Sequence, residues 1–244
     1  MFDFVLLAKE ALSFIASLLF PKRCIRCRKS GEYVCDNCFA TISFLQHQLC
    51  GVCQKGSIDG LTHPKCRTKH GIDGIISSIA YKGIVKKLLY QFKYKPYLSD
   101  LKLILGQLLY EGIIQQESFE NYISDKKVWI TSVPLHKARE RKRGYNQSEL
   151  LAKELYFRFN FPYHELLIRE KQTKPQFELK KEERSKNILG AFSVDNKLRN
   201  KIKGKKILLV DDITTTGATL RECGKTLKKS GAVKVLGVTL AHEG

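Results

Sequence analysis

Residues 207–221 read ILLVDDITTTGATLR, and this stretch decides the fold class. The four apolar residues 207–210 predict a buried parallel strand, with Asp211 and Asp212 at its carboxyl end. A Thr/Gly loop comes next and leads into residues with helical spacing. In open α/β sheets, ligands bind beyond the carboxyl ends of the strands, and a helix N-terminus offers free N–H groups to a phosphate. The stretch therefore predicts an anion site with two carboxylates beside it.

The same stretch resembles the phosphoribosyl diphosphate (PRPP) signature of type I phosphoribosyltransferases, in which strand, acidic pair, small-residue loop and helix follow in one order. The resemblance implies that Asp211 and Asp212 hold the ribose 2′ and 3′ hydroxyls. It also implies that the 5′-phosphate is cradled by Thr214, Thr215, Thr216, Gly217, Ala218 and Thr219. A loop without lysine can bind phosphate only through backbone N–H and hydroxyl groups, which requires small residues. The plainer interpretation is a strand end followed by a helix-capping turn.

The chain has 244 residues, enough for one α/β domain of roughly 150 residues and a smaller module. Its 43 Lys and Arg against 24 Asp and Glu residues give a formal charge of +19, which favours polyanionic partners such as nucleic acid, nucleotides or an anionic membrane surface. Seven of the eight cysteines fall between Cys24 and Cys66. Their grouping as CxxC pairs beside a nucleotide-type domain argues for metal ligands in a reducing cytosol rather than disulfides.

Residues 1–20 are apolar enough to raise the question of a signal peptide or membrane anchor. Asp3, Lys9 and Glu10 interrupt the stretch, and the uncharged run after them is too short to span a bilayer. The apolar residues recur at helical spacing, and Pro21 ends the pattern. We therefore expect no transmembrane segment but an amphipathic helix that docks on the rest of the protein or on a partner, with membrane association as the alternative.

A zinc-binding module is predicted for residues 21–72. Two CxxC motifs, Cys24 with Cys27 and Cys35 with Cys38, are seven residues apart and supply four thiolates for one tetrahedral ion. A thioredoxin-like redox pair is the alternative for a single CxxC, but the second motif and the missing βαβ pattern argue against it. Four protein ligands leave no position for a substrate water, so the zinc is expected to be structural.

A second, less complete set of metal ligands follows. It comprises Cys50, Cys53 and Cys66, with His70 as the first candidate for the fourth ligand and His63 as the alternative. Lys69 stands where a second CxxC would place its cysteine, and lysine is not a usual zinc ligand. A second zinc and a loop without metal both remain open.

Residues 73–125 join the module to the core and combine cations with aromatic rings. Residues 75–81 predict a strand, and the following helix has an apolar stripe of Ile84, Val85, Leu88, Leu89 and Phe92. Lysines interleaved with tyrosines suit single-stranded nucleic acid, because cations track phosphates while rings stack on bases; an ordinary solvated helix face is the alternative. The candidate nucleic-acid-binding residues are Lys86, Lys87, Tyr90, Lys93 and Tyr94, together with Arg141 and Lys142 further along. A second amphipathic helix, residues 98–114, serves packing.

The core is expected over residues 126–244 and begins with a strand at 128–133. Five cations in the seven positions 137–143 then crowd a loop, and they repel one another unless an anion lies among them. In a phosphoribosyltransferase that anion is pyrophosphate, whose departing charge these cations and Mg²⁺ would stabilise; a nucleic-acid backbone and a solvated flap are the alternatives. The candidate pyrophosphate ligands are Ser132, Val133, Pro134, Lys137, Arg139 and Arg143.

A helix is predicted to begin near Gln147, because Asn146 and Glu149 have the spacing of a capping box. A short helix near residues 180–187, a helix after the Thr/Gly loop and a last strand in VKVLGVTLA complete the expected core. Cys223 falls on the apolar stripe of the helix after the loop and is expected to be a core thiol.

Several motifs occur in one order along nearly the whole chain: LFPxxC, CIRC, CDNC, VPL with RGYNQSELLA, and VDDITTTGAT. A further segment contributes Pro175, Gln176, Glu183, Arg184, Asn187, Gly190, Ala191 and Phe192. This set resembles the ComF family, also called ComFC or GntX-like proteins. The resemblance implies an α/β fold with a type I phosphoribosyltransferase-like parallel sheet, a small N-terminal zinc-binding module, and a cytoplasmic role in handling incoming single-stranded DNA in naturally competent bacteria. Thr215 stands where purine-salvage relatives often carry an aspartate, so no acid/base residue is evident.

Three functions follow as hypotheses. The first is a competence-associated protein that binds PRPP or a related ribose phosphate, with Mg²⁺, and single-stranded DNA during natural transformation. The second is an active phosphoribosyltransferase of nucleotide metabolism, in which pyrophosphate leaves the anomeric carbon. The third is a zinc-dependent docking protein for a partner of the competence machinery, such as a DNA-translocating ATPase. No acceptor substrate is indicated.

Overall fold

The computed structural model describes residues 21–94, 96–124, 127–173 and 181–243. The amphipathic helix expected at residues 1–20 lies outside these ranges, as do Pro175 and Gln176. None of the helices in the described ranges has both the length and the hydropathy that a bilayer crossing requires.

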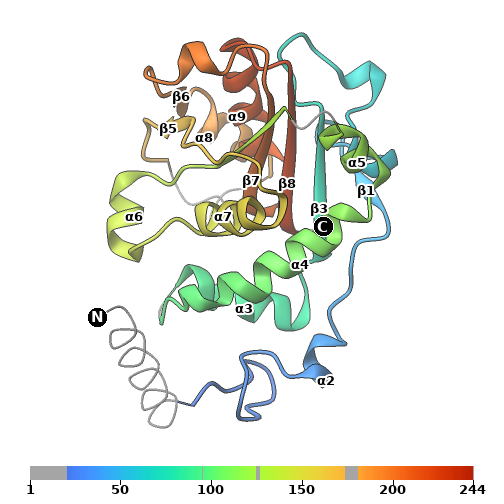
Figure 1. Ribbon diagram of the computed structural model, residues 1–244, viewed down its shortest axis with the longest axis vertical. Helices are drawn as coiled ribbons and strands as arrows, with labels where there is room; N and C mark the ends of the chain where they lie inside the picture. The colour runs from blue at the N-terminus through green and yellow to red at the C-terminus, as the bar shows by residue number, and fades with distance from the viewer. Residues whose placement is uncertain (1–20, 95, 125–126, 174–180, 244) are drawn as a thin grey trace, which may run out of the picture.

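Four parallel strands form the central sheet, in the order β3-β8-β7-β4 (Figure 1). They are β3 (Gly74–Ala80), β4 (Val128–Ser132), β7 (Lys206–Thr214) and β8 (Lys234–His242). The expected strand at residues 207–210 is confirmed, and its side chains are fully buried because helices cover both faces of the sheet. The strand continues further than predicted, so Asp211 and Asp212 lie inside β7 rather than after it.

Helices α3 (Gly83–Lys93), α4 (Lys102–Ile114) and α7 (Gln147–Phe159) cover one face of the sheet, and α9 (Ala218–Lys229) covers the other (Figure 1). Alternate side chains of β7 point to opposite faces of the sheet. Leu208 and Val210 pack with α3, α4 and α7, whereas Leu209 packs with α9. Cys223 of α9 is fully buried in this second cluster, which confirms the expected core thiol.

The apolar stripe predicted for α3 is confirmed, since all five of its residues are buried. The helix ends at Lys93, and Tyr94 is its C-cap. The helix expected at residues 98–114 begins as a 3₁₀ turn, η3 (Ser99–Leu101), before α4. Helix α5 (Glu117–Ile123) follows, and its Tyr122 hydroxyl donates to the Ile207 carbonyl at 2.8 Å.

A small antiparallel pair, β5 (Leu167–Arg169) and β6 (Phe192–Val194), lies beside the main sheet. Helix α8 (Lys181–Ile188) connects the two strands and confirms the short helix expected near residues 180–187. The 3₁₀ turn η5 (Arg199–Lys201) leads from β6 toward β7.

The cysteine-rich segment contains α2 (Asp36–Phe39), β1 (Gln48–Leu49) and β2 (Gly56–Ser57), and the 3₁₀ turns η1 (Ile58–Gly60) and η2 (Pro64–Cys66). Between α2 and β1 the chain runs antiparallel to β3: the Leu45 N–H donates to Ser78 O at 2.9 Å, and the Ala80 N–H donates to Ser43 O at 3.1 Å. The segment therefore covers the outer edge of β3, which would otherwise expose unpaired backbone groups.

Candidate functional site

The loop between β7 and α9 is the centre of the candidate site. Thr214 Oγ1 accepts a hydrogen bond from the Gly217 N–H at 3.1 Å. Gly217 has a φ of 71°, and a Cβ there would lie 2.9 Å from the Ile75 side chain, so this corner needs glycine. The Thr216 hydroxyl is buried and has no hydrogen-bond partner among the described residues. Since buried polar groups normally have a partner, this hydroxyl fits a ligand atom such as a phosphate oxygen.

The remaining predicted phosphate ligands surround the same corner. Thr215 and Thr219 are half-buried, and Ala218 is buried in the first turn of α9. The corner thus sits at the N-terminus of a twelve-residue helix, where the helix dipole favours an anion.

The two aspartates beside the loop are held differently. Asp211 Oδ1 accepts hydrogen bonds from the Ser148 hydroxyl at 2.8 Å and from the Asp212 N–H at 2.9 Å. Burial raises the pKa of Asp211 to about 7, the Asp212 carboxylate contributes to the rise, and the Ser148 hydroxyl opposes it. Asp212 is only 5% exposed, and its Oδ2 lies 2.8 Å from Lys93 Nζ. The pair can thus accept hydrogen bonds from neighbouring hydroxyl groups of one ligand.

Lys93 is the unexpected member of this site. The sequence interpretation placed it among the nucleic-acid-binding residues of α3, but its ammonium group pairs with Asp212. It comes from the last turn of α3, and no local pattern relates it to β7. Ser148, which anchors Asp211, was also missed; it is the second residue of α7, where Asn146 caps the helix by accepting from the Ser148 N–H at 3.1 Å.

The cationic segment 137–143 forms a helix, α6 (Lys137–Arg143), and not the loop expected from its charge density. His136 caps its start, with Nδ1 accepting from the Ala138 N–H at 3.3 Å, and Gly144 ends it with a φ of 85°. Three of the cations fall in the last turn, where they face the negative end of the helix dipole. The helix dipole therefore offsets part of the repulsion among the cations of residues 137–143, and the caps stabilise the two helix ends.

The candidate pyrophosphate ligands do not all face the aspartates. Arg143 lies with its guanidinium 5.7 Å from the Tyr94 ring centre; burial lowers its pKa and the Asp212 carboxylate opposes the change. Arg139 donates to the Thr173 carbonyl at 2.6 Å, and Lys137 is exposed.

The end of β4 is tied into the sheet. The Val133 N–H donates to Val210 O at 2.9 Å, and its carbonyl accepts from Asn146 Nδ2 at 3.0 Å. Ser132 Oγ lies 3.1 Å from the Tyr163 hydroxyl, and Pro134 is half-buried. The main-chain groups of Val133 thus already have partners.

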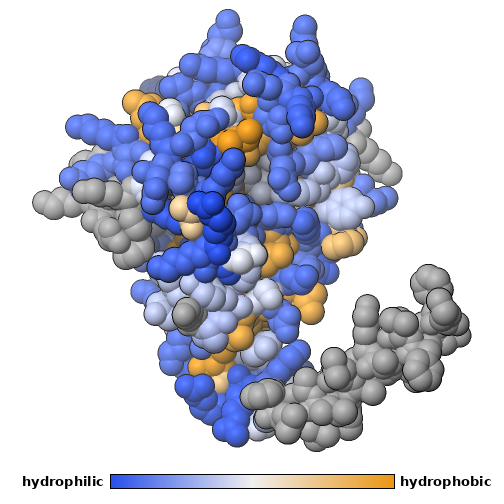
Figure 2. Space-filling model, turned by 90° about the vertical axis from the view of Figure 1, so that its left-hand side faces the viewer, coloured by the Kyte–Doolittle hydropathy of each residue, from blue (hydrophilic) through white to orange (hydrophobic). Residues whose placement is uncertain are grey.

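The outer face of α3 carries the remaining candidate nucleic-acid ligands. Lys86 and Lys87 are exposed, Tyr90 is 59% exposed, and the Tyr90 and Tyr94 rings lie 5.0 Å apart between centroids. Arg141 and Lys142 of α6 are exposed as well. The side of the molecule shown in Figure 2, which is the left-hand side of Figure 1 where α6 is seen, is predominantly hydrophilic.

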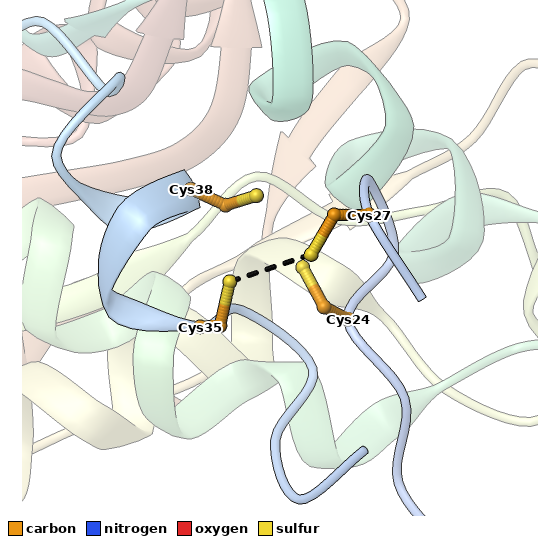
Figure 3. A group of neighbouring side chains, drawn as sticks. All are labelled: Cys24, Cys27, Cys35 and Cys38. Carbon is orange, nitrogen blue, oxygen red and sulfur yellow. Dashed lines mark hydrogen bonds between the residues drawn. The ribbon is translucent and has the colours of Figure 1, made fainter. Parts of the chain in front are cut away.

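The four-cysteine centre predicted from the sequence is confirmed as a cluster. The sulfur atoms of Cys24, Cys27, Cys35 and Cys38 point toward one another (Figure 3) and all lie within 4.8 Å of one another. Zn–S bonds of about 2.3 Å spread four thiolates over distances of this size. Burial acts to raise the pKa of Cys24, but backbone N–H groups outweigh it and lower the pKa to about 6, whereas burial and the neighbouring thiols raise the pKa of Cys38. The donor set fits a structural zinc ion.

The second centre consists of Cys50, Cys53, His63 and Cys66, again within 4.8 Å. The expectation that His70 is the fourth ligand is wrong, and the alternative, His63, holds that position. His63 directly precedes the η2 turn, in which the Cys66 N–H donates to His63 O at 2.8 Å and brings both side chains to one place.

The ring of His63 is oriented for a metal. Its Nδ1 lies 3.3 Å from Cys53 Sγ, while Nε2 lies 3.0 Å from the Gly56 carbonyl. A histidine ligand usually donates its other ring N–H to a carbonyl in this way, so the set fits a second structural zinc.

A pocket of about 170 Å³ is lined by residues of both the cysteine-rich segment and the β7–α9 loop. Its wall includes Leu49 and Gly51 on the cysteine-rich side, and Thr215 and His242 on the sheet side. The cysteine-rich segment therefore forms part of the surroundings of the candidate ligand site.

Comparison with known proteins agrees with this layout. A phosphoribosyl transferase domain model matches residues 143–243, and a double zinc ribbon domain model matches residues 15–67. Competence protein ComFC of Bacillus subtilis (strain 168) is 30% identical over 226 residues, covering 87% of this chain and 85% of the relative. The chain belongs to the ComF family.

Other relatives in the family include DNA utilization protein YhgH of Escherichia coli (strain K12), which is 26% identical over 213 residues, 87% of this chain and 85% of the relative. Competence protein F of Haemophilus influenzae is 36% identical over 107 residues, which cover 43% of this chain and 46% of that protein. The expected fold class, a phosphoribosyltransferase-like parallel sheet with N-terminal zinc-ribbon sites, is confirmed.

Proposed function

We propose that this ComF-family protein binds PRPP or a closely related ribose phosphate at the β7–α9 corner, together with Mg²⁺, and binds single-stranded DNA on the face formed by α3 and α6. The observation that carries the first part is the buried Thr216 hydroxyl, which has no partner among the described residues and lies at a helix N-terminus next to the half-buried Asp211 and the buried Asp212. A phosphate oxygen is the chemical group that such a corner accepts.

The ribose phosphate is held in two parts. Backbone N–H groups at the start of α9 and the Thr216 hydroxyl bind the 5′-phosphate, and Asp211 and Asp212 accept hydrogen bonds from the ribose hydroxyls. Lys93 and Arg143 bring positive charge to the aspartate side, where they attract the diphosphate of the ligand. A divalent cation, when bound, neutralises the remaining charge of the diphosphate.

Thr216→Val tests the phosphate contact, because it removes the hydroxyl with little change in shape. We expect PRPP affinity with Mg²⁺, measured by calorimetry, to fall by roughly tenfold to a hundredfold, since a hydrogen bond to a charged group contributes about 1.5–3 kcal/mol. Thr226→Val, on the same helix but bonded to the Glu222 carbonyl, is the matched control and leaves affinity within about twofold of the wild type. Wild-type protein that binds no PRPP in Mg²⁺ would refute the proposal.

The second part rests on exposed rings flanked by cations. Tyr90 and Tyr94 offer adjacent ring faces, and bases stack on such rings while nearby lysines neutralise phosphates. Lys86→Ala with Lys87→Ala should weaken binding of single-stranded DNA and reduce the slope of log affinity against log salt by about 1.4, or 0.7 for each phosphate that the variant no longer neutralises. Lys153→Ala, which removes an exposed lysine paired with Glu149 on α7, is the control for removal of a lysine elsewhere on the surface. Unchanged affinity and salt slope in the double variant would exclude this face.

A further inference from the structure

The second metal centre contacts the loop between β7 and α9, residues 214–219, which is called the phosphate loop. Gly51 lies between two ligands of that centre, and its carbonyl accepts a hydrogen bond from Arg221 Nη1 at 2.5 Å. The same nitrogen donates to the Thr216 carbonyl. Gln54 Nε2, from the residue after Cys53, also donates to Thr216 O at 3.2 Å. Two side chains thus fix the backbone of the residue whose hydroxyl is proposed to bind phosphate.

Gly51 and Gly217 meet at a tight junction that also includes Ile75 of β3. A Cβ on Gly217 would lie 3.0 Å from the Gly51 carbonyl oxygen, and a Cβ on Gly51 would collide with the Ile75 side chain. Both positions therefore need glycine, although Gly51 belongs to the metal centre and Gly217 to the phosphate loop. The contact is a packed junction between two glycine-containing turns.

The position of Gln54 depends on the turn that carries the metal ligands. Its N–H donates to the Cys50 carbonyl at 2.9 Å, its side-chain amide lies 3.4 Å from the same carbonyl, and its φ is 61°. A non-glycine residue adopts this left-handed conformation only where its surroundings hold it. An ion bound by Cys50 and Cys53 would close this turn and so hold Gln54 against Thr216.

Arg221 is suited to bridge the two carbonyls. Its guanidinium is half-buried; burial lowers its pKa and the nearby Cys50 opposes the change. A planar guanidinium can serve two acceptors at once, whereas a lysine ammonium on a flexible stem holds them less rigidly.

We propose that the Cys50/Cys53/His63/Cys66 centre positions the phosphate loop, with Arg221 and Gln54 as positioning residues. Metal ligation fixes the turn at Gly51, the turn fixes the Thr216 backbone, and loss of metal from this centre lowers affinity for ribose phosphate. The inference rests on the proposed function for its ligand, but the coupling between centre and loop can be measured without one.

Removing one ligand from each centre separates a positioning role from a general one. Cys53→Ser should lose about one zinc per chain, weaken PRPP binding in Mg²⁺ by roughly tenfold or more, and speed hydrogen exchange of residues 214–219. Cys27→Ser, the matched change in the first centre, should also lose about one zinc but, well below the melting transitions of both variants, speed exchange at residues 214–219 less than Cys53→Ser does. Equal effects of the two variants on the loop would overturn the proposal.

Two variants that retain all metal ligands test the connection itself. Gln54→Ala and Arg221→Lys should keep the zinc content of the wild type, yet weaken PRPP binding several-fold and speed exchange at residues 214–219. Gln107→Ala, an exposed glutamine bonded to Glu111 on α4, is the control and should change neither quantity. Wild-type affinity and wild-type loop exchange in both variants would overturn the proposal even if Cys53→Ser fails to fold.

The hydrogen-exchange measurement also distinguishes failure of the proposed PRPP binding from failure of the proposed coupling between the second centre and the loop. If wild-type protein binds no PRPP, the proposed function fails, while faster exchange at residues 214–219 in Cys53→Ser still supports the coupling. If PRPP binds but loop exchange and affinity do not depend on the second centre, only the coupling fails.

Discussion

The two metal centres of this protein have similar ligands but different surroundings. Cys24, Cys35 and Cys38 are buried in the same apolar cluster as α3 and α4, and Cys27 is exposed. In the second centre, the turn that carries Cys50 and Cys53 contacts Thr216 and α9. The first centre is therefore placed to stabilise the fold, and the second is placed to influence the ligand site. The predictions that follow test this difference, from the largest expected effect to the smallest.

The first prediction concerns stability at the four-cysteine centre. Cys38→Ser should lower the melting temperature by more than about 10 °C, because structural zinc contributes on the order of 10 kcal/mol in small modules and this one packs on α3. Thermal denaturation followed by circular dichroism, with zinc counted by metal analysis, measures the effect. Cys66→Ser in the second centre should lower the melting temperature less. The reverse order would contradict the assignment of the first centre to fold stability.

Some features were predictable from sequence because they depend on local periodicity. The strand at 207–210 and the apolar stripe of α3 follow from neighbouring residues alone. The fourth ligand of the second centre did not, because spacing allowed both histidines and only the turn at Pro64 selects His63. For α6, charge density suggested a loop, although Gly144 was a helix-end signal that could have been used.

The contacts that build the site could not be predicted from local sequence patterns. Gln54 and Thr216 are 162 positions apart, and Arg221 lies 170 positions after Gly51. Nothing in the spacing of either segment indicates its partner, because these contacts arise only when the cysteine-rich segment covers the edge of β3. Lys93 is a similar case: its charge suggested nucleic acid, and only the fold directs it to Asp212.

The second prediction concerns α3, which packs near the first centre and ends at the acidic pair. Lys93→Met should destabilise the protein by about 2 kcal/mol, or roughly 4–8 °C, because it leaves the buried Asp212 carboxylate without its cation. Lys87→Met, an exposed lysine of the same helix, should change the melting temperature by less than about 2 °C. Equal melting temperatures for the two variants would show that the ion pair contributes nothing.

The smallest change in melting temperature is expected from a substitution of Asp211, and this change depends on pH. Its folded-state pKa is raised to about 7 from an ordinary value of 3.8, so the folded protein binds this proton more tightly than the unfolded chain. Stability contributed by the neutral acid is fully present below about pH 4 and decreases as pH rises toward and through 7. Asp211→Asn, which keeps an oxygen to accept from Ser148, should therefore melt roughly 2–4 °C above wild type at about pH 8, a gain of about 1 kcal/mol, and close to it at about pH 4.

The same variant should bind PRPP more weakly at about pH 8, because an amide accepts hydrogen bonds from ribose hydroxyls less strongly than a carboxylate does. A gain in stability together with a decrease in affinity is what a site that trades stability for function predicts, since the cost of keeping the half-buried Asp211 charged is offset only when ligand is bound. Wild-type stability at this pH combined with weaker binding would mean that Asp211 is ionised in the free protein at no cost. In that case the free protein would carry no stability cost at Asp211, and the acidic pair would serve only as hydrogen-bond acceptors for the ligand.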